Sequence, residues 1–439
     1  VLQLRQVPAE SLSIYVADVE TGDVVLDWRA DEPRNPASTI KLLTTLVALD
    51  VLGPAYRWRT DVHALGEIRD GRLDGDLLLK GFGDPFLVTE RVWQFVRRIR
   101  VEGIDEITGD LVLDDSWFDV GRSDPGAFDN QPLRAYNVVP NALLFNFKVV
   151  RYRFEPDGNS VKVSVDPALE NLKVDNRLRV RQGHCGGFQR GIAVNMNGAN
   201  DTVIFEGRFP SGCERYAMDR TALSHEAFSW GLFGLLWREG GGRFSGGWSK
   251  GIAPEEAEPL FSFRSPSLSE LITRVNKYSN NVMARHLLYT LDAEVNGPPG
   301  TEAGGRELIL KWLADRGLES CELALENGAG LSREVRICTS AMGEMLQYAW
   351  QQPYMPEFLS SMSLSGLDGT LRRRFNGSEL VGQAHLKTGS LDHVSAIAGY
   401  LQAGSGRRFV VAAMVNHDDV HRGPGEELQE ALLRWLYEQ

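Results

Sequence analysis

Three short motifs carry the residue types that could perform catalysis. The first, S-T-I-K at residues 38–41, places a hydroxyl and an amine three positions apart, so Ser38 and Lys41 would project from one face of a helix. A serine hydroxyl is a weak nucleophile that needs a neighbouring base, and a lysine can supply one where desolvation lowers its pKa. Most such pairs lie on surfaces, but this lysine sits in an almost wholly apolar segment. The motif predicts Ser38 as nucleophile and Lys41 as its base, with free N–H groups at the helix start facing an oxyanion.

The second motif is Ser279-Asn280-Asn281, near the end of a predicted helix. A second serine and an amide could relay a proton and hold a substrate amide. The alternative is a helix C-cap or turn, where serine and asparagine are common.

The third motif is K-T-G-S at residues 387–390, at the end of a predicted strand. A cation, a hydroxyl and a glycine that permits close approach suit the binding of a substrate carboxylate beside an edge strand. The alternative is an ordinary strand-to-turn segment.

The elements that must position these motifs can be read from the hydrophobic pattern. Residues 12–28 alternate as a β-hairpin, and 38–52 is predicted to be a buried helix because it is apolar nearly all round. After Ser265 a capping box of Ser267 and Glu270 starts another helix. Further helices are expected at 304–316, 339–351 and 426–437, and strands at 385–388, 394–401 and 408–415.

The middle of the chain has a different pattern of residues, typical of short strands and turns. From about residue 60 to 262, short strands with Gly, Asp and Pro at the turns are expected, with helices at 88–101 and 221–238 and a loop over 240–251. The chain has no internal repeat that would indicate a solenoid or propeller.

Composition excludes several classes of protein. The 439 residues carry a net charge of −12, which argues against a nucleic-acid partner because phosphate neutralisation needs clustered Lys and Arg. No apolar run approaches the roughly 20 residues of a transmembrane helix. The chain opens with VLQLRQVPAES instead of a signal peptide, as expected of a processed form. No Cys/His cluster has zinc spacing and the eight histidines form no evident cluster, so neither a metal nor a cofactor is expected.

Together the three motifs match the S-x-x-K, S-D-N, K-T-G set of penicillin-binding proteins and serine β-lactamases, with Asn280 in place of the middle aspartate. The chain more closely resembles the class C low-molecular-mass penicillin-binding proteins, the DacB-type D-alanyl-D-alanine carboxypeptidase/endopeptidase family (peptidase family S13). Asn327 and Ala329 stand where family members often carry Asp and Ser. The similarity covers most of the chain and is weakest over 120–260; it rests on NPASTIKLLTTLVALDVLG, GDLLLKGFGDP, ENGAGLSR, LSGLDGTLRRR and LKTGSLDHVSAIAGYL.

This resemblance implies an α+β fold, the serine β-lactamase/DD-peptidase fold, in which helices flank an antiparallel sheet. Ser38 and Ser279 must meet in one site although 241 positions separate them (279 − 38), which implies a large insertion. We expect a discontinuous catalytic domain carrying two nested, mainly β inserted domains. The expected ranges are 1–62 with 264–439 for the catalytic domain, 63–86 with 166–263 for inserted domain II, and 87–165 for inserted domain III.

The resemblance also implies roles for the motif residues in cleaving peptidoglycan stem peptides. Ser38 would attack the D-Ala–D-Ala carbonyl with Lys41 as base, and Ser279 would pass the proton to the leaving amine. Asn281 would orient the substrate amide and Lys41, while Lys387 would set the electrostatics. Thr388, Gly389 and Ser390 would bind substrate, with Thr388 on the terminal carboxylate, and the oxyanion hole would use the N–H groups of Ser38 and Ser390. β-Lactams would acylate Ser38 and deacylate slowly.

Two alternatives remain open. A serine β-lactamase shares the motifs, but the chain has no E-x-x-L-N pattern in 42–278, and compact β-lactamases leave no room for a 200-residue insertion. A non-catalytic binding or scaffold protein is disfavoured because every proposed catalytic side chain is intact.

The four cysteines allow three pairings, and composition alone favours four buried thiols of a cytosolic enzyme at least as much as disulfides. The resemblance implies a periplasmic, oxidising location, which favours disulfides Cys185–Cys213 and Cys321–Cys338. Whether the protein forms a homodimer is left open.

Overall fold

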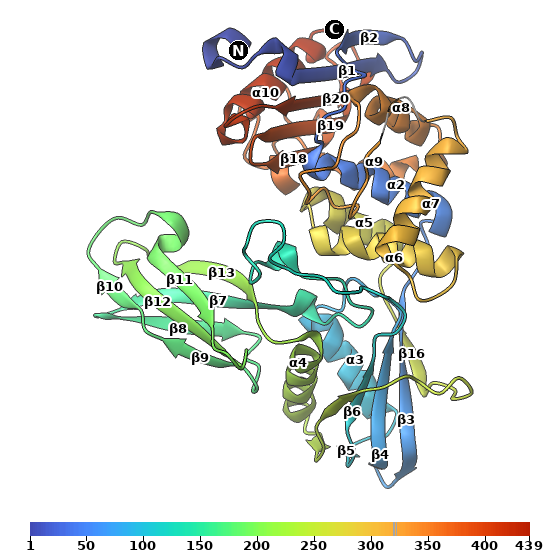
Figure 1. The fold of residues 1–439 in the computed structure, drawn as a ribbon, viewed down its shortest axis with the longest axis vertical. Helices are drawn as coiled ribbons and strands as arrows, with labels where there is room; N and C mark the ends of the chain where they lie inside the picture. The colour runs from blue at the N-terminus through green and yellow to red at the C-terminus, as the bar shows by residue number, and fades with distance from the viewer. Residues whose placement is uncertain (319–320, 322) are drawn as a thin grey trace. The chain divides into compact units, whose positions relative to one another are not determined.

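The computed structural model describes residues 1–318, 321 and 323–439. The chain forms two compact units, one made of residues 1–57 with 266–439 and the other of residues 58–265 (Figure 1). The first unit is built from both ends of the chain. The expected catalytic domain of 1–62 with 264–439 differs from it by a few residues at each crossing.

The first unit contains a six-stranded sheet in the order β17-β18-β19-β20-β1-β2, antiparallel throughout. Figure 1 shows β1 from the N-terminal end lying beside β20 from the C-terminal end. The strands are β1 (Leu12–Asp18), β2 (Val24–Trp28), β17 (Ser363–Leu364), β18 (Ala384–Leu391), β19 (Val394–Gln402) and β20 (Arg408–Asn416).

Helices cover both faces of this sheet, so β19 and β20 are apolar almost continuously instead of alternating. Helix α10 (Pro424–Tyr437) packs Leu433 and Leu436 against Ile397 and Leu401 on one face. On the other face the Tyr400 hydroxyl donates to the carbonyl of Leu346 in α8 (Thr339–Trp350).

Most of the remaining helices of this unit pack against the helix that follows Ser38. A short 3₁₀ helix, Ala37–Ile40, leads into α2 (Lys41–Leu52), which is buried over its first nine residues. Helix α5 (Leu268–Lys277) begins with the predicted capping box. The others are α1 (Leu2–Arg5), α6 (Asn281–Val295), α7 (Glu302–Ala314) and α9 (Met355–Ser360).

The second unit contains one seven-stranded sheet with helices and two smaller sheets around a shared apolar core. The large sheet has the order β14-β5-β4-β3-β16, with β6 paired to β4 and β15 to β6. Its elements are β3 (Arg59–Arg69), β4 (Arg72–Gly81), α3 (Thr89–Val101), β5 (Glu106–Ile107), β6 (Leu111–Asp114), α4 (His225–Glu239), β14 (Arg243–Phe244), β15 (Trp248–Lys250) and β16 (Phe261–Arg264).

The smaller sheets are β13-β7-β8 and a four-stranded sheet in which β12 pairs with β9, β10 and β11. The disulfide Cys185–Cys213 lies in this part of the chain. The strands are β7 (Val149–Asp157), β8 (Ser160–Asp166), β9 (Lys173–Asn176), β10 (Arg179–Arg181), β11 (Ile192–Met196), β12 (Thr202–Pro210) and β13 (Tyr216–Thr221).

These pairings do not follow the expected boundary between the two inserted domains. Strands β5 and β6 lie within 87–165 but pair with β4 outside it, and β7 and β8 lie within 87–165 but share a sheet with β13. The sheets therefore divide near residue 149 and again near 221, instead of at 87 and 165.

Several predicted elements also need correction. The helix expected at 221–238 begins at His225, because residues 216–221 form β13. The expected loop 240–251 contains β14 and β15, and the strand expected at 385–388 extends to Leu391. Ser279 lies near the end of α5 as predicted, and a further helix, α6, begins directly after it at Asn281.

Candidate active site

Lys41 lies at the centre of the three motifs. Its Nζ is 2.8 Å from Ser38 Oγ and 2.7 Å from Asn281 Oδ1, and it also donates to the carbonyl of Ala329. The 3₁₀ turn followed by the first residue of α2 places Ser38 and Lys41 on the same side, as their spacing requires. The lysine is fully buried whereas Ser38 is only partly buried, so the hydroxyl is reachable and the amine is not.

Burial sets the protonation of this lysine. Loss of solvation holds the pKa of Lys41 well below its usual value, and the positive charge of Lys387 lowers it further. Within the described part of the chain, neither lysine forms an ion pair that would restore its charge. The site therefore favours a neutral amine next to the Ser38 hydroxyl, which is the state that a general base requires.

The backbone before Ser38 is held in a left-handed conformation. Ala37 has φ 44°, which is costly for a residue with a Cβ and persists only where neighbours impose it. The Asn35 side chain accepts from the Ala37 N–H at 2.8 Å. The Asn416 side chain in turn exchanges hydrogen bonds with the Asn35 backbone, at 2.7 and 3.1 Å. This pairing of residues 381 apart fixes the turn that presents Ser38.

Lys387 joins the second and third motifs. Its Nζ is 3.0 Å from Ser279 Oγ and 2.6 Å from the Thr388 carbonyl. Burial lowers the pKa of Lys387 to about 7. Ser279 is held at φ 56°, and the Thr388 hydroxyl lies 2.8 Å from that of Thr370. A cation that titrates near neutrality beside two hydroxyls is suited to receive an anionic group, whose charge would raise the pKa of the lysine.

Strand β18 passes close to the nucleophile turn at Gly389. A Cβ built on Gly389 would lie 2.4 Å from the Pro36 carbonyl oxygen and 3.0 Å from the Ser38 backbone nitrogen. Only glycine permits this approach, which brings the strand segment containing Ser390 beside the Ser38 backbone. Two backbone N–H groups on neighbouring segments are the donor set of an oxyanion hole.

Comparisons with known proteins agree with this geometry. The sequence model of the D-Ala-D-Ala carboxypeptidase 3 (S13) family matches residues 1–439. The chain belongs to this family. The resemblance predicted from the motifs is thereby confirmed, as is the expected serine-type D-Ala-D-Ala carboxypeptidase activity.

Individual relatives of this S13 carboxypeptidase extend over most of its length. A D-alanyl-D-alanine carboxypeptidase of Actinomadura sp. is 28% identical over 94% of this chain and 78% of the relative. Penicillin-binding protein 4 (DacB) of Haemophilus influenzae superposes on this chain with a TM-score of 0.84 at 22% identity, covering 99% of this chain and 98% of that protein. A second structure of the same protein holds a β-lactam. A predatory peptidoglycan endopeptidase of Bdellovibrio bacteriovorus has a TM-score of 0.56 at 15% identity, covering 97% and 90%. The predicted DD-peptidase fold is confirmed.

The S13 site contains contacts that the motifs did not predict. The Ala329 carbonyl accepts from Lys41, and the loop that carries it is closed by the Asn327 side chain, which accepts from the Ala329 N–H and donates to the Leu331 carbonyl. The segment ENGAGLSR marked this loop, but no side chain signalled a carbonyl ligand for the lysine.

Two further findings bear on where this carboxypeptidase resides. Both expected disulfides, Cys185–Cys213 and Cys321–Cys338, are formed, as expected outside the cytoplasm. Across the residues that the structure describes, none of the helices is both long and apolar enough for a bilayer.

Proposed function

We propose that Ser38 is the nucleophile of a periplasmic D,D-peptidase that acts on peptidoglycan stem peptides through an acyl-enzyme. The observation that carries this proposal is the buried Lys41 amine, which is hydrogen-bonded to Ser38, Asn281 and a backbone carbonyl. Among the residues described in the structure, no carboxylate forms an ion pair with it. An amine kept neutral in contact with a serine hydroxyl is poised to remove its proton.

In the first step Ser38 Oγ attacks the carbonyl carbon of the penultimate D-Ala, and Lys41 Nζ accepts the hydroxyl proton. The oxyanion is stabilised by the N–H groups of Ser38 and Ser390, each worth on the order of 10²–10³ in rate for such a donor. As the C–N bond breaks, Ser279 donates its proton to the leaving amine of the terminal D-Ala and is reprotonated from the lysine pair. The products of this step are free D-Ala and an ester on Ser38.

Substrate binding uses the remaining motif residues. Lys387 and Thr388 receive the terminal carboxylate, and Asn281 orients the peptide amide while holding Lys41. Gly389 lets the substrate strand and the nucleophile turn approach. A water molecule activated by Lys41 then attacks the ester, which returns the proton to Ser38 and releases the shortened peptide.

The same chemistry covers two substrates and one class of inhibitor. A crosslinked dimer offers a D-Ala carbonyl bonded to a diamino acid, so endopeptidase cleavage needs only a larger leaving amine. The activity of the Bdellovibrio relative and the β-lactam bound to the Haemophilus relative support both extensions. A β-lactam would acylate Ser38 and remain attached because its ring-opened product blocks the water.

Defined muropeptides test the proposal. The enzyme should release D-Ala from a monomeric pentapeptide and separate a crosslinked dimer, with both products identified by mass. Ser38→Ala should abolish both reactions, whereas Ser405→Ala, in the exposed turn between β19 and β20, should retain both. Full D-Ala release by Ser38→Ala would overturn the nucleophile assignment.

A labelled penicillin separates the peptidase from the β-lactamase alternative. The acyl-enzyme on Ser38 should persist for many minutes and survive denaturing electrophoresis. Rapid turnover of the label would favour the β-lactamase.

A further inference from the structure

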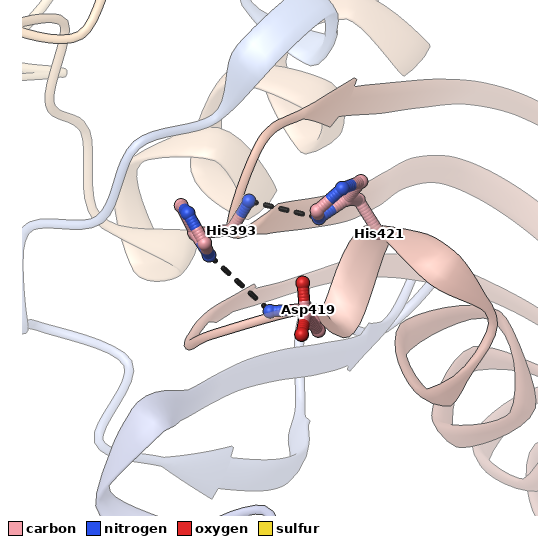
Figure 2. Close-up of side chains that lie close together, drawn as sticks. All are labelled: His393, Asp419 and His421. Atoms are coloured by element: carbon pink, nitrogen blue, oxygen red, sulfur yellow. Dashed lines mark hydrogen bonds between the residues drawn. The ribbon is translucent and has the colours of Figure 1, made fainter. Parts of the chain in front are cut away.

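The turn between β18 and β19 and the segment between β20 and α10 bring together two histidines that are 28 residues apart. The His393 N–H donates to His421 Nδ1 at 2.9 Å, and the Asp419 N–H donates to His393 Nδ1 at 3.2 Å. Figure 2 shows the Asp419 carboxylate on one side of the two neighbouring imidazole rings. The sequence spacing predicted no histidine cluster, because the two segments meet only in the folded sheet.

We propose that His393, Asp419 and His421 form a binding site for a divalent transition-metal ion such as zinc. One ligand atom from each residue lies within 4.8 Å of the other two. Two imidazoles and one carboxylate are a common set of protein ligands for zinc, and an exposed position leaves a fourth place for water. The nitrogen donors favour zinc, copper or nickel over magnesium or calcium, which prefer oxygen.

Backbone N–H groups and two carboxylates surround the imidazole nitrogens. Each Nδ1 accepts a backbone N–H, so its lone pair reaches a metal ion only after that hydrogen bond opens. His421 Nε2 lies 3.6 Å from the Asp392 carboxylate, the outer partner that commonly fixes the tautomer of a metal-binding histidine. A carboxylate oxygen of Asp418 lies 3.3 Å from His393 Nδ1 and adds negative charge.

Binding requires a small contraction of the cluster. Tetrahedral bonds of about 2.0–2.1 Å place ligand atoms about 3.4 Å apart, so separations of up to 4.8 Å must close by about 1.4 Å or less. His393 is exposed, so its ring can rotate away from the Asp419 N–H, and the exposed Asp419 side chain can turn toward the ion. The partly buried His421 ring must release the His393 N–H. Arg422 Nε lies 3.4 Å from an Asp419 oxygen, but this exposed pair is worth little and gives way to a dication.

The location gives the ion a structural role next to the Ser38 site. His393 follows β18, the strand that carries Ser390, and the His417 N–H donates to the His393 carbonyl at 3.0 Å. The neighbouring Asn416 supports the Asn35 turn before Ser38. A bound ion would tie these two segments together and raise the midpoint of thermal unfolding.

Cobalt provides a direct probe on the full chain. Titration with Co²⁺ should give one equivalent with the visible absorption bands of nitrogen-ligated cobalt, and Zn²⁺ should displace it. His393→Gln/His421→Gln should weaken the affinity at least 100-fold and remove the zinc-dependent rise in unfolding temperature. Asp392→Asn should weaken it about tenfold.

His417→Gln is the matched control, because this histidine lies in the same segment but outside the cluster. It should bind cobalt like the parent. Labelling of Ser38 by a fluorescent penicillin reports independently that each variant is folded. A parent chain that binds no cobalt, or a double variant that is labelled and binds cobalt like the parent, would overturn the site without affecting the peptidase assignment.

Discussion

Replacing Gly389 by alanine perturbs the contact between β18 and the nucleophile turn with a single methyl group. The added Cβ would lie 2.4 Å from the Pro36 carbonyl oxygen, 3.0 Å from the Ser38 nitrogen and 3.1 Å from Ala37 Cβ. Two of these neighbours are backbone atoms that cannot rotate away. Ordinary contact begins at 3.4 Å, so the strand must move away from the turn by about 1 Å.

This displacement should affect acylation more than stability. The Ser390 N–H follows the mutated position directly. Losing one oxyanion donor costs about 10²–10³ in rate, and a misplacement of about 1 Å costs about 10². Overpacking costs about 1–3 kcal/mol, partly offset by the roughly 0.5–1 kcal/mol that alanine gains over glycine in a strand. We therefore expect acylation to fall 100- to 1,000-fold while the variant remains folded.

The assay is the second-order rate of acylation by a fluorescent penicillin, read beside the thermal unfolding midpoint. Gly198→Ala is the matched control, because its Cβ would meet no atom within 4 Å, and it should leave both values unchanged. A folded Gly389→Ala enzyme that acylates within threefold of the parent would refute the inferred oxyanion geometry.

Three further predictions follow from the same contacts. Because the pKa of Lys41 is lowered, the rate of acylation should rise with pH as the neutral amine accumulates. Lys387→Met removes the neighbouring positive charge and should therefore shift this rise to higher pH. A pH–rate profile whose rising limb moves to lower pH would contradict this prediction. Asn280→Ala removes the N-cap of α6 that accepts from the Met283 N–H, and it should lower the free energy of unfolding by about 1 kcal/mol with little effect on acylation. Asn281→Ala removes a hydrogen-bond partner of Lys41 and should slow acylation at least tenfold. Equal effects of the two variants on stability and on acylation would contradict these separate roles. Asn35→Ala leaves buried backbone and amide groups without partners and should lower the free energy of unfolding by about 1–3 kcal/mol per group, as measured by urea denaturation. An unchanged denaturation midpoint would refute the stabilising role of the Asn35 hydrogen bonds.

The sequence predicted the parts of the site that depend on local spacing. Ser38 and Lys41 lie one turn apart because any helix places i and i+3 together, and the capping box began α5 where predicted. Several elements around the sheet of the first unit were also recognisable, from an apolar period in α5 and from continuous apolar runs in α2, β19 and β20. Helix α6 was not predicted.

The parts that depend on long-range pairing were not predictable. The Asn35–Asn416 exchange and the His393–His421 contact join segments that carry no shared pattern, and the Ala329 carbonyl has no side-chain signature. The strand pairings of the inserted region do not follow the predicted boundaries for a related reason. Its parallel pairings, such as β4 with β6 and β9 with β12, join strands without a connecting turn that sequence could reveal.

The two crossings between the units have a consequence for how such an enzyme could arise. Thr60 pairs with Phe263, and Trp58 and Ser265 exchange hydrogen bonds, so the second unit begins and ends on adjacent antiparallel strands. The 208 residues from 58 to 265 therefore connect two neighbouring points of the first unit's chain, as the loop of a short hairpin would. The conformational entropy lost when the ends of this segment are brought together is therefore lost when the second unit folds, and not when the Ser38 site assembles. A gene fragment inserted at this point would need only a stable module with neighbouring termini, which makes this position one where an ancestral peptidase could acquire a large domain at little cost to its active site.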